Sequence, residues 1–301
     1  MVQKIKISTN GAELSQIVLG FWRLRDWNLN QQELENLIRQ SIDLGISSFD
    51  HADIYGSFTC EEIFGEVLKA NPSLRNQIQL ITKCDIVFKS PQRPQYNFHY
   101  YDTSKQHIIS SAERSLQNFG TDRLDILLIH RVDPLMNADE VAEAFNELKQ
   151  SGKVLNFGVS NFLPSQFELL QNRLDFPLVT NQVEFNVMHF DPMEDGTFDL
   201  MQQKRVSPMI WSPLAGGRIF TEQSEQANRL RSTFAELSEK NNATTDQLAL
   251  AWIHKLPCNP VSVIGSGKIE RVKSAAVSVN INLSREDWFK VWAASKGHEV
   301  P

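Results

Sequence analysis

The sequence contains few of the features that usually mark secreted or membrane proteins. Its 301 residues include only three cysteines, which are far apart and form no C-x-x-C pair. This usage favours a reducing compartment and argues against a structural zinc site. No apolar run approaches the roughly 20 residues of a membrane span, and the opening MVQKIKISTNG has no apolar signal segment. We therefore expect a cytoplasmic protein with no membrane partner.

Other absences concern ligands and domain boundaries. The net charge is −6 and no long basic run occurs, so nucleic acid is not an expected partner. The sequence has no G-x-G-x-x-G, so a Rossmann-type dinucleotide site is not expected. No linker or low-complexity tract interrupts the chain, and residues 1–301 are expected to form a single domain.

Short strand-like runs alternate with helical patterns along the chain. KIKIS and TNGAEL at the N-terminus predict a β-hairpin that leads into a first buried strand. Apolar residues recur at helical spacing from Leu34 to Ile42, and Gly45 predicts the end of that helix. The strand-like runs occupy residues 17–21, 47–52, 79–84, 124–130, 156–160, 180–185, 208–212 and 261–265.

Helical stretches separate nearly all of these runs, which predicts a parallel sheet. Eight β-α units in a chain of 301 residues fit an α/β fold with a single (β/α)8 TIM barrel and an N-terminal β-hairpin. An open, doubly wound sheet is the alternative.

The segment SSFDHADIYG contains the second predicted barrel strand and the start of the loop after it. Side chains alternate along a strand, so Phe49 should pack against the helices and Asp50 should face the barrel mouth. His51 then points outward, and Tyr55 lies on the following loop. Active sites of this fold lie at the C-terminal ends of the strands, where Asp50 and Tyr55 are expected.

The next two strands also end in ionisable residues, Lys83 in ITKC and His130 in LLIH. An ammonium close to Tyr55 should lower the pKa of the tyrosine hydroxyl, and Asp50 can supply the counter-charge that a buried lysine needs. A histidine can hold a carbonyl oxygen in place. Together these groups would form a proton donor for a carbonyl that receives a hydride.

A metal-dependent hydrolase is an alternative interpretation of the same residues. His51 and Asp53 could be metal ligands, completed by Lys83 and His130. However, DHAD is not the His-x-His pair that such barrel sites usually offer, and Phe49 argues that the neighbouring histidine faces outward.

A glycosidase would pair Asp50 with Glu184, which leaves Lys83 and Tyr55 without roles. A single histidine or lysine at a strand end is usually structural. Four complementary groups at neighbouring strand ends favour a catalytic role instead.

Seven motifs resemble one known family. FDHADIYG, ITKC, LLIH, GVSNF, NQVEFN, WSPLAGG and VIGSGKIERV occur in the order found in aldo-keto reductases, and the sequence is most similar to the bacterial YdhF-like branch. The resemblance implies an NADP-dependent reductase of aldehydes or ketones, with Tyr55 as proton donor. Lys83 and Asp50 would tune the tyrosine, and His130 would orient the carbonyl. A regulatory barrel that binds cofactor with little turnover is the alternative within the family.

The later strand ends can hold a nicotinamide. Ser160, Asn161 and Gln182 carry hydroxyl and amide groups that suit its carboxamide. Trp211 occupies the position where family members usually stack a tyrosine or phenylalanine on the ring. The structural alternatives are that Asn161 serves the start of a helix before Pro164 and that the tryptophan is a core aromatic.

The cofactor phosphates should lie after the last two strands. Lys268 and Arg271 would be unfavourable at a helix N-terminus unless an anion binds there, and an arginine suits the 2′-phosphate of NADP(H). Solvated surface charge is the alternative. At the positions where many relatives use an asparagine or glutamate to contact adenine, this sequence has Ser274 and Ala275, so the same adenine contact is not expected. The expected contacts are Ser212, Leu214, Gly216, Gly265, Ser266, Lys268 and Arg271.

The substrate side should be aromatic. Residues 85–103 are too many for an ordinary β-α loop, and they include Phe88 and several tyrosines. With Trp22 and Ile54, these side chains suit apolar aldehydes or ketones, or else simply pack the loop. No motif specifies one carbonyl compound or an oligomeric state.

Overall fold

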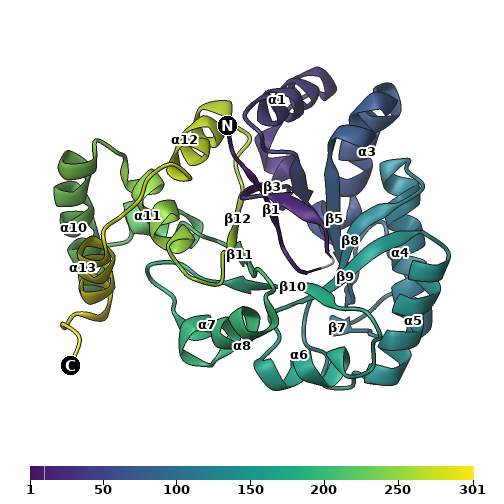
Figure 1. Cartoon of the computed structure of the whole chain (residues 1–301). Coiled ribbons are helices and arrows are strands. Elements are labelled where there is room, and N and C mark those ends of the chain that lie inside the picture. Colours follow the sequence, from purple (N-terminus) through teal and green to yellow (C-terminus); the bar gives the residue numbers. More distant parts are fainter. Residues whose placement is uncertain (10) are drawn as a thin grey trace.

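The computed structural model describes residues 1–9 and 11–301, and its centre is a closed barrel of eight parallel strands (Figure 1). Consecutive β-α units place each strand beside the previous one, which confirms the predicted TIM barrel and excludes the open sheet. In spatial order the strands are β10 (Leu178–Glu184), β11 (Met209–Trp211), β12 (Val261–Ile264), β3 (Ile17–Gly20), β4 (Ser48–Asp50), β5 (Gln79–Cys84), β8 (Leu124–Ile129) and β9 (Val154–Ser160).

Helices surround the barrel, and their ends carry the expected signals. The first begins with a capping box between Asn30 and Glu33 and is followed by Gly45 at φ 88°. The α-helices are α1 (Gln31–Asp43), α2 (Tyr55–Phe58), α3 (Cys60–Ala70), α4 (Lys105–Phe119), α5 (Ala138–Gln150), α6 (Pro164–Gln171), α7 (Asp191–Glu194), α8 (Thr197–Lys204), α9 (Arg218–Thr221), α10 (Glu225–Asn241), α11 (Thr245–His254), α12 (Ile269–Ser278) and α13 (Arg285–Lys296). Short 3-10 turns are η1 (Leu24–Trp27), η2 (Pro72–Gln77) and η3 (Ala215–Gly217).

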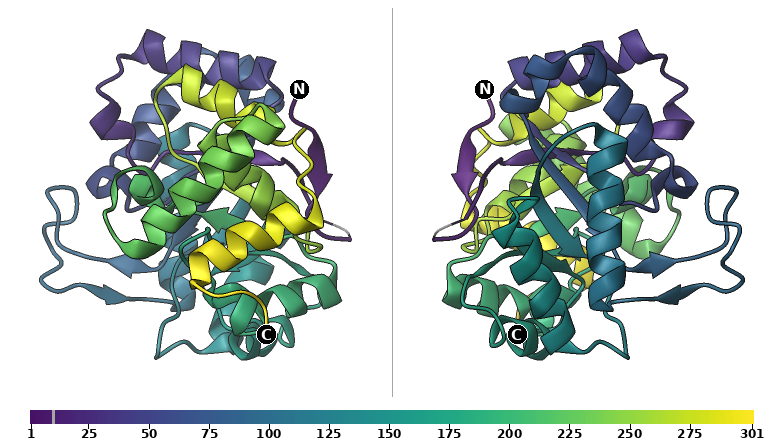
Figure 2. Two further views of the ribbon diagram at one scale, coloured as in Figure 1. Left: turned by 90° about the vertical axis from the view of Figure 1, so that its left-hand side faces the viewer. Right: turned by 90° about the vertical axis from the view of Figure 1, so that its right-hand side faces the viewer.

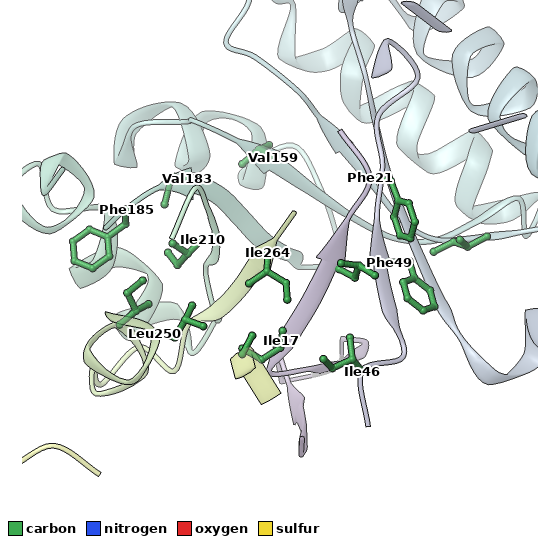
Figure 3. Packing of buried hydrophobic residues seen from close by; sticks show 14 of the residues in the cluster. Ile17, Phe21, Ile46, Phe49, Val159, Val183, Phe185, Ile210, Leu250 and Ile264 are labelled. Carbon is green, nitrogen blue, oxygen red and sulfur yellow. The ribbon is translucent and has the colours of Figure 1, made fainter. Parts of the chain in front are cut away.

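Alternation along the strands produces two separate hydrophobic clusters. The larger one lies between the strands and the helices, and Figure 3 shows part of it, including Phe21 and Phe49. Their ring centres are 5.8 Å apart in an edge-to-face arrangement. Each such aromatic side chain contributes about 1.5–3 kcal/mol when it is fully buried. This packing fixes which face of each strand turns toward the barrel interior.

The smaller cluster fills the barrel interior near the N-terminal ends of the strands. The hairpin strands β1 (Lys4–Lys6) and β2 (Glu13–Ser15) pair antiparallel, as predicted. Ile7 and Leu14 from this hairpin are fully buried in the interior cluster. The hairpin therefore closes one end of the barrel with apolar side chains and leaves the C-terminal strand ends for polar groups.

The long loop 85–103 forms a second hairpin, which projects from the barrel (Figure 2). Its strands β6 (Ile86–Val87) and β7 (Tyr100–Tyr101) pair antiparallel. Both tyrosines are exposed. The sequence showed that the loop is unusually long, but not that it contains paired strands.

Candidate active site

The candidate catalytic residues meet at the C-terminal ends of β4, β5 and β8. Lys83 lies two residues after the interior residue Ile81, and His130 lies two residues after the interior residue Leu128. Asp50 has the same inward direction because its neighbour Phe49 belongs to the outer cluster. All three ionisable side chains are buried, with residue exposures between 1% and 8%.

Lys83 is the centre of this group. Its Nζ donates to both carboxylate oxygens of Asp50, at 2.9 and 2.7 Å, to the main-chain oxygen of His51 at 2.7 Å and to Tyr55 Oη at 3.1 Å. Burial alone lowers the pKa of the lysine, but the attraction of the Asp50 carboxylate and of Tyr55 outweighs it, so the pKa is raised. The side chain is therefore an ammonium at neutral pH.

Tyr55 differs from the expectation in one respect. Burial raises the pKa of its hydroxyl, and the opposing effect of the Lys83 ammonium is smaller, so the pKa is raised rather than lowered. The Lys83 ammonium lowers the pKa, as expected, but burial and the nearby Asp50 carboxylate raise it, and their effect is larger. The hydroxyl is consequently a protonated group at neutral pH, with a cation beside it.

His130 is a neutral imidazole in this environment. Burial, Lys83 and Arg131 all lower its pKa, which lies well below the usual range. Its ring centre is 6.0 Å from that of Tyr55. A neutral imidazole beside the hydroxyl can donate a hydrogen bond without adding a second positive charge.

Gln182 connects this cluster to the opposite wall of the barrel. Its Nε2 donates to Asp50 Oδ1 at 2.8 Å, and its main-chain oxygen accepts from Ser160 Oγ at 2.7 Å. Both side chains are almost fully buried. The amide that was expected to meet a nicotinamide carboxamide is thus engaged with the counter-ion of Lys83.

Asn161 and Trp211 extend the same network. Asn161 Nδ2 donates to Ser160 Oγ at 2.9 Å and to the main-chain oxygen of His130 at 3.3 Å. Trp211 Nε1 donates to Asn161 Oδ1 at 2.9 Å. Asn161 therefore does not cap α6, whose N-cap is Leu163. The indole supplies a donor that a phenylalanine at this position would lack.

Arg131 was not among the predicted site residues, although it follows His130 directly. Its main-chain N–H donates to Asp85 Oδ2 at 2.9 Å, and its guanidinium carbon lies 5.8 Å from the ring centre of Trp211. The available signal was a cation immediately after a strand-end histidine, at the rim where active sites of this fold lie.

The expected phosphate region is open. A side-chain atom added at Gly216 or Gly217 would meet nothing within 4 Å, so the loop backbone is accessible. Lys268 is the N-cap of α12, and Arg271 lies in its first turn; both are exposed. Ser212 and Leu214 are half-buried, as is Ser266, whereas Gly265 is exposed. An accessible glycine-containing loop, together with a helix N-terminus that carries two cations, fits a dinucleotide phosphate.

The residues expected to bind substrate are less buried than the ionisable residues at the strand ends. Trp22 is 62% exposed, and Ile54 and Phe88 are half-buried. Phe88 packs against Phe58 with ring centres 4.9 Å apart, and Arg93 from the projecting hairpin lies over Phe58 at 5.1 Å. These aromatic side chains serve at least partly to pack the loop.

The metal interpretation lacks a donor cluster. Within residues 1–9 and 11–301, no group of three His, Cys, Asp or Glu residues lies close enough to hold a metal ion. His51 points outward, as predicted, and is stacked on Phe21 at 4.6 Å with Phe64 and Phe119 at its edges. Asp50, which the glycosidase interpretation requires, is bound to Lys83 and Gln182.

None of the described helices has the length and apolar character of a membrane span.

Comparison with known proteins identifies the family of this chain. The sequence model of the aldo/keto reductase family matches residues 16–296. The chain therefore belongs to the aldo/keto reductase family, whose members are oxidoreductases that use nicotinamide cofactors and act on small carbonyl compounds.

Particular relatives cover the whole chain. It is 49% identical over 302 residues to the oxidoreductase YdhF of Escherichia coli, with 100% of both chains covered, which confirms the predicted branch. It is 39% identical to the 6-dehydroglucose reductase of Agrobacterium fabrum, over 99% of this chain and 100% of that one. Among solved structures, an aldo/keto reductase from Klebsiella pneumoniae in complex with NADP and acetate has a TM-score of 0.76 and 23% identity, covering 97% of this chain and 94% of that one.

Proposed function

We propose that residues 1–301 form one catalytic domain that reduces aldehydes or ketones to alcohols with NADPH, and that Tyr55 is the proton donor. The observation that supports this most strongly is the contact of Tyr55 Oη with Lys83 Nζ at 3.1 Å, while the same ammonium is held by Asp50. This arrangement combines a protonated hydroxyl with a fixed positive charge.

The bound nicotinamide would supply the hydride to the carbonyl carbon. As negative charge develops on the carbonyl oxygen, Tyr55 transfers its proton to that oxygen and becomes a tyrosinate. The Lys83 ammonium stabilises the tyrosinate, and the carboxylate of Asp50 keeps the ammonium in place. His130 donates a hydrogen bond to the same oxygen, which orients the carbonyl.

The cofactor is expected to lie across the strand ends. Asn161 and Ser160 would bind the carboxamide, and Trp211 would stack on the nicotinamide ring. Gln182 would hold the carboxylate of Asp50 in place through its hydrogen bond. The open loop from Ser212 to Gly217 and the start of α12 would bind the phosphates. Arg271 favours NADPH because its guanidinium suits the 2′-phosphate.

The test is oxidation of NADPH and NADH by purified protein with a panel of aldehydes and ketones. A sugar-derived aldehyde belongs in the panel because one relative is a 6-dehydroglucose reductase. Turnover with the proposed NADPH preference is the expected result. Cofactor binding without turnover of any carbonyl would refute the proposal and favour a regulatory barrel.

A further inference from the structure

A cleft beside the catalytic cluster is lined by Asn161 and Trp211, which the proposed function assigns to the nicotinamide, and by further polar residues that have no role in the mechanism above. It encloses about 290 Å³ at the C-terminal ends of β9 and β10. Arg131 follows His130 directly in the chain, and Asn161 donates to the main-chain oxygen of that histidine, so this side of the cleft lies beside His130. The cleft is therefore adjacent to the position where a reacting carbonyl would be held.

The guanidinium of Arg131 is the notable group on this side of the cleft. The side chain is half-buried, and within the described part of the chain its guanidinium forms no ion pair and no hydrogen bond and lies over the face of Trp211. A guanidinium has five N–H donors in a fixed planar arrangement. Near the reacting carbonyl, these donors can bind oxygen atoms on neighbouring carbons of a substrate.

The other residues that line the cleft indicate which kind of substrate oxygen atom Arg131 would bind. Glu184, Asp191 and Asp195 border the same cleft, and none of them pairs with Arg131. Three carboxylates and one guanidinium make an anionic substituent unfavourable. A hydroxyl group suits both kinds of side chain, because it accepts from the guanidinium and donates to a carboxylate.

We propose that this cleft binds the hydroxylated chain of an uncharged, sugar-like aldehyde or ketone, and that Arg131 determines the preference for such substrates. Arg131 donates to the oxygen next to the carbonyl, and Glu184 accepts from a hydroxyl further along. This assignment rests on the reductase function proposed above.

The experiment compares three aldehydes of equal chain length: erythrose, which is hydroxylated, butanal, which is apolar, and succinic semialdehyde, which carries a carboxylate. The measured quantity is the ratio of kcat/KM between two aldehydes for each variant. Such a ratio is independent of the fraction of correctly folded protein, because both substrates meet the same active molecules.

Arg131→Met should lower the erythrose-to-butanal ratio at least about tenfold, as expected when a charge-assisted hydrogen bond is lost. Arg173→Met is the matched control, because Arg173 is a surface residue paired with Asp139 and should leave the ratio unchanged. Glu184→Gln should raise the relative kcat/KM for succinic semialdehyde over erythrose, because one repelling carboxylate is removed.

If wild-type protein reduces butanal but Arg131→Met and the control give the same ratio, the cleft assignment is overturned and the reductase function stands. If Arg131→Met loses only its activity toward succinic semialdehyde, the cleft binds a carboxylate and the assignment to hydroxyl groups is wrong. If no aldehyde or ketone is reduced with either cofactor, the proposed function fails and this inference fails with it.

Discussion

The ion pair between Lys83 and Asp50 offers a sharp test, because stability and rate should respond to it differently. The two side chains are 1% and 3% exposed and 2.7 Å apart. Replacing Lys83 by Met leaves a carboxylate buried without its cation, which typically costs about 3–5 kcal/mol of unfolding free energy. It also removes the donor to Tyr55, so kcat should fall sharply.

The double variant Lys83→Met with Asp50→Asn removes both charges, and the new amide can still accept from Gln182. It should recover about 1–3 kcal/mol relative to the sum of the single changes. It should recover none of the rate, because the hydroxyl of Tyr55 still lacks its neighbouring ammonium.

Urea unfolding and steady-state NADPH oxidation measure the two quantities. Lys240→Met is the matched control: it breaks the pair with the buried Asp287 far from the site, so it should lower stability and leave kcat unchanged. Strict additivity of the unfolding free energies, or a double variant with near wild-type kcat, would refute the reasoning.

Three further changes test separate parts of the account. Arg271→Ala should weaken NADPH binding by about 10–100-fold and leave NADH binding nearly unchanged, and equal losses in a fluorescence titration would contradict its role. Trp211→Phe removes the indole donor to Asn161 and should weaken cofactor binding about fivefold; an unchanged Kd would show that this hydrogen bond does not orient the amide. Burial lowers the pKa of His254 to about 4, so the unfolded chain binds more protons below about pH 6.5 and stability falls with acidity. When the pH falls from about 7 to about 5, the wild type should therefore lose about 2 kcal/mol more unfolding free energy than His254→Gln. Equal losses in urea titrations would contradict this.

The fold could be predicted because strand-type and helix-type patterns of apolar residues alternate along the whole chain. Alternation within one short strand was sufficient to place Phe49 outward and Asp50 inward. The same local rule put Lys83 and His130 at the same end of the barrel.

The connections across the barrel could not be predicted in this way. Gln182 reaches Asp50 over a separation of 132 residues, and only closure of the sheet brings them together. The raised pKa of Tyr55 depends on the balance between burial, the Lys83 ammonium and the Asp50 carboxylate, which cannot be worked out from the sequence. The surroundings of the Arg131 guanidinium depend on a cleft whose lining comes from several separate segments, which no local motif marks.

The central claim is that Tyr55 donates the proton, and Tyr55→Phe tests it most directly. The substitution keeps the ring beside Lys83 and His130 and removes only the hydroxyl. The account predicts nearly unchanged NADPH binding in a fluorescence titration and a kcat lower by about 10²–10⁴. Turnover close to that of the wild type would contradict it.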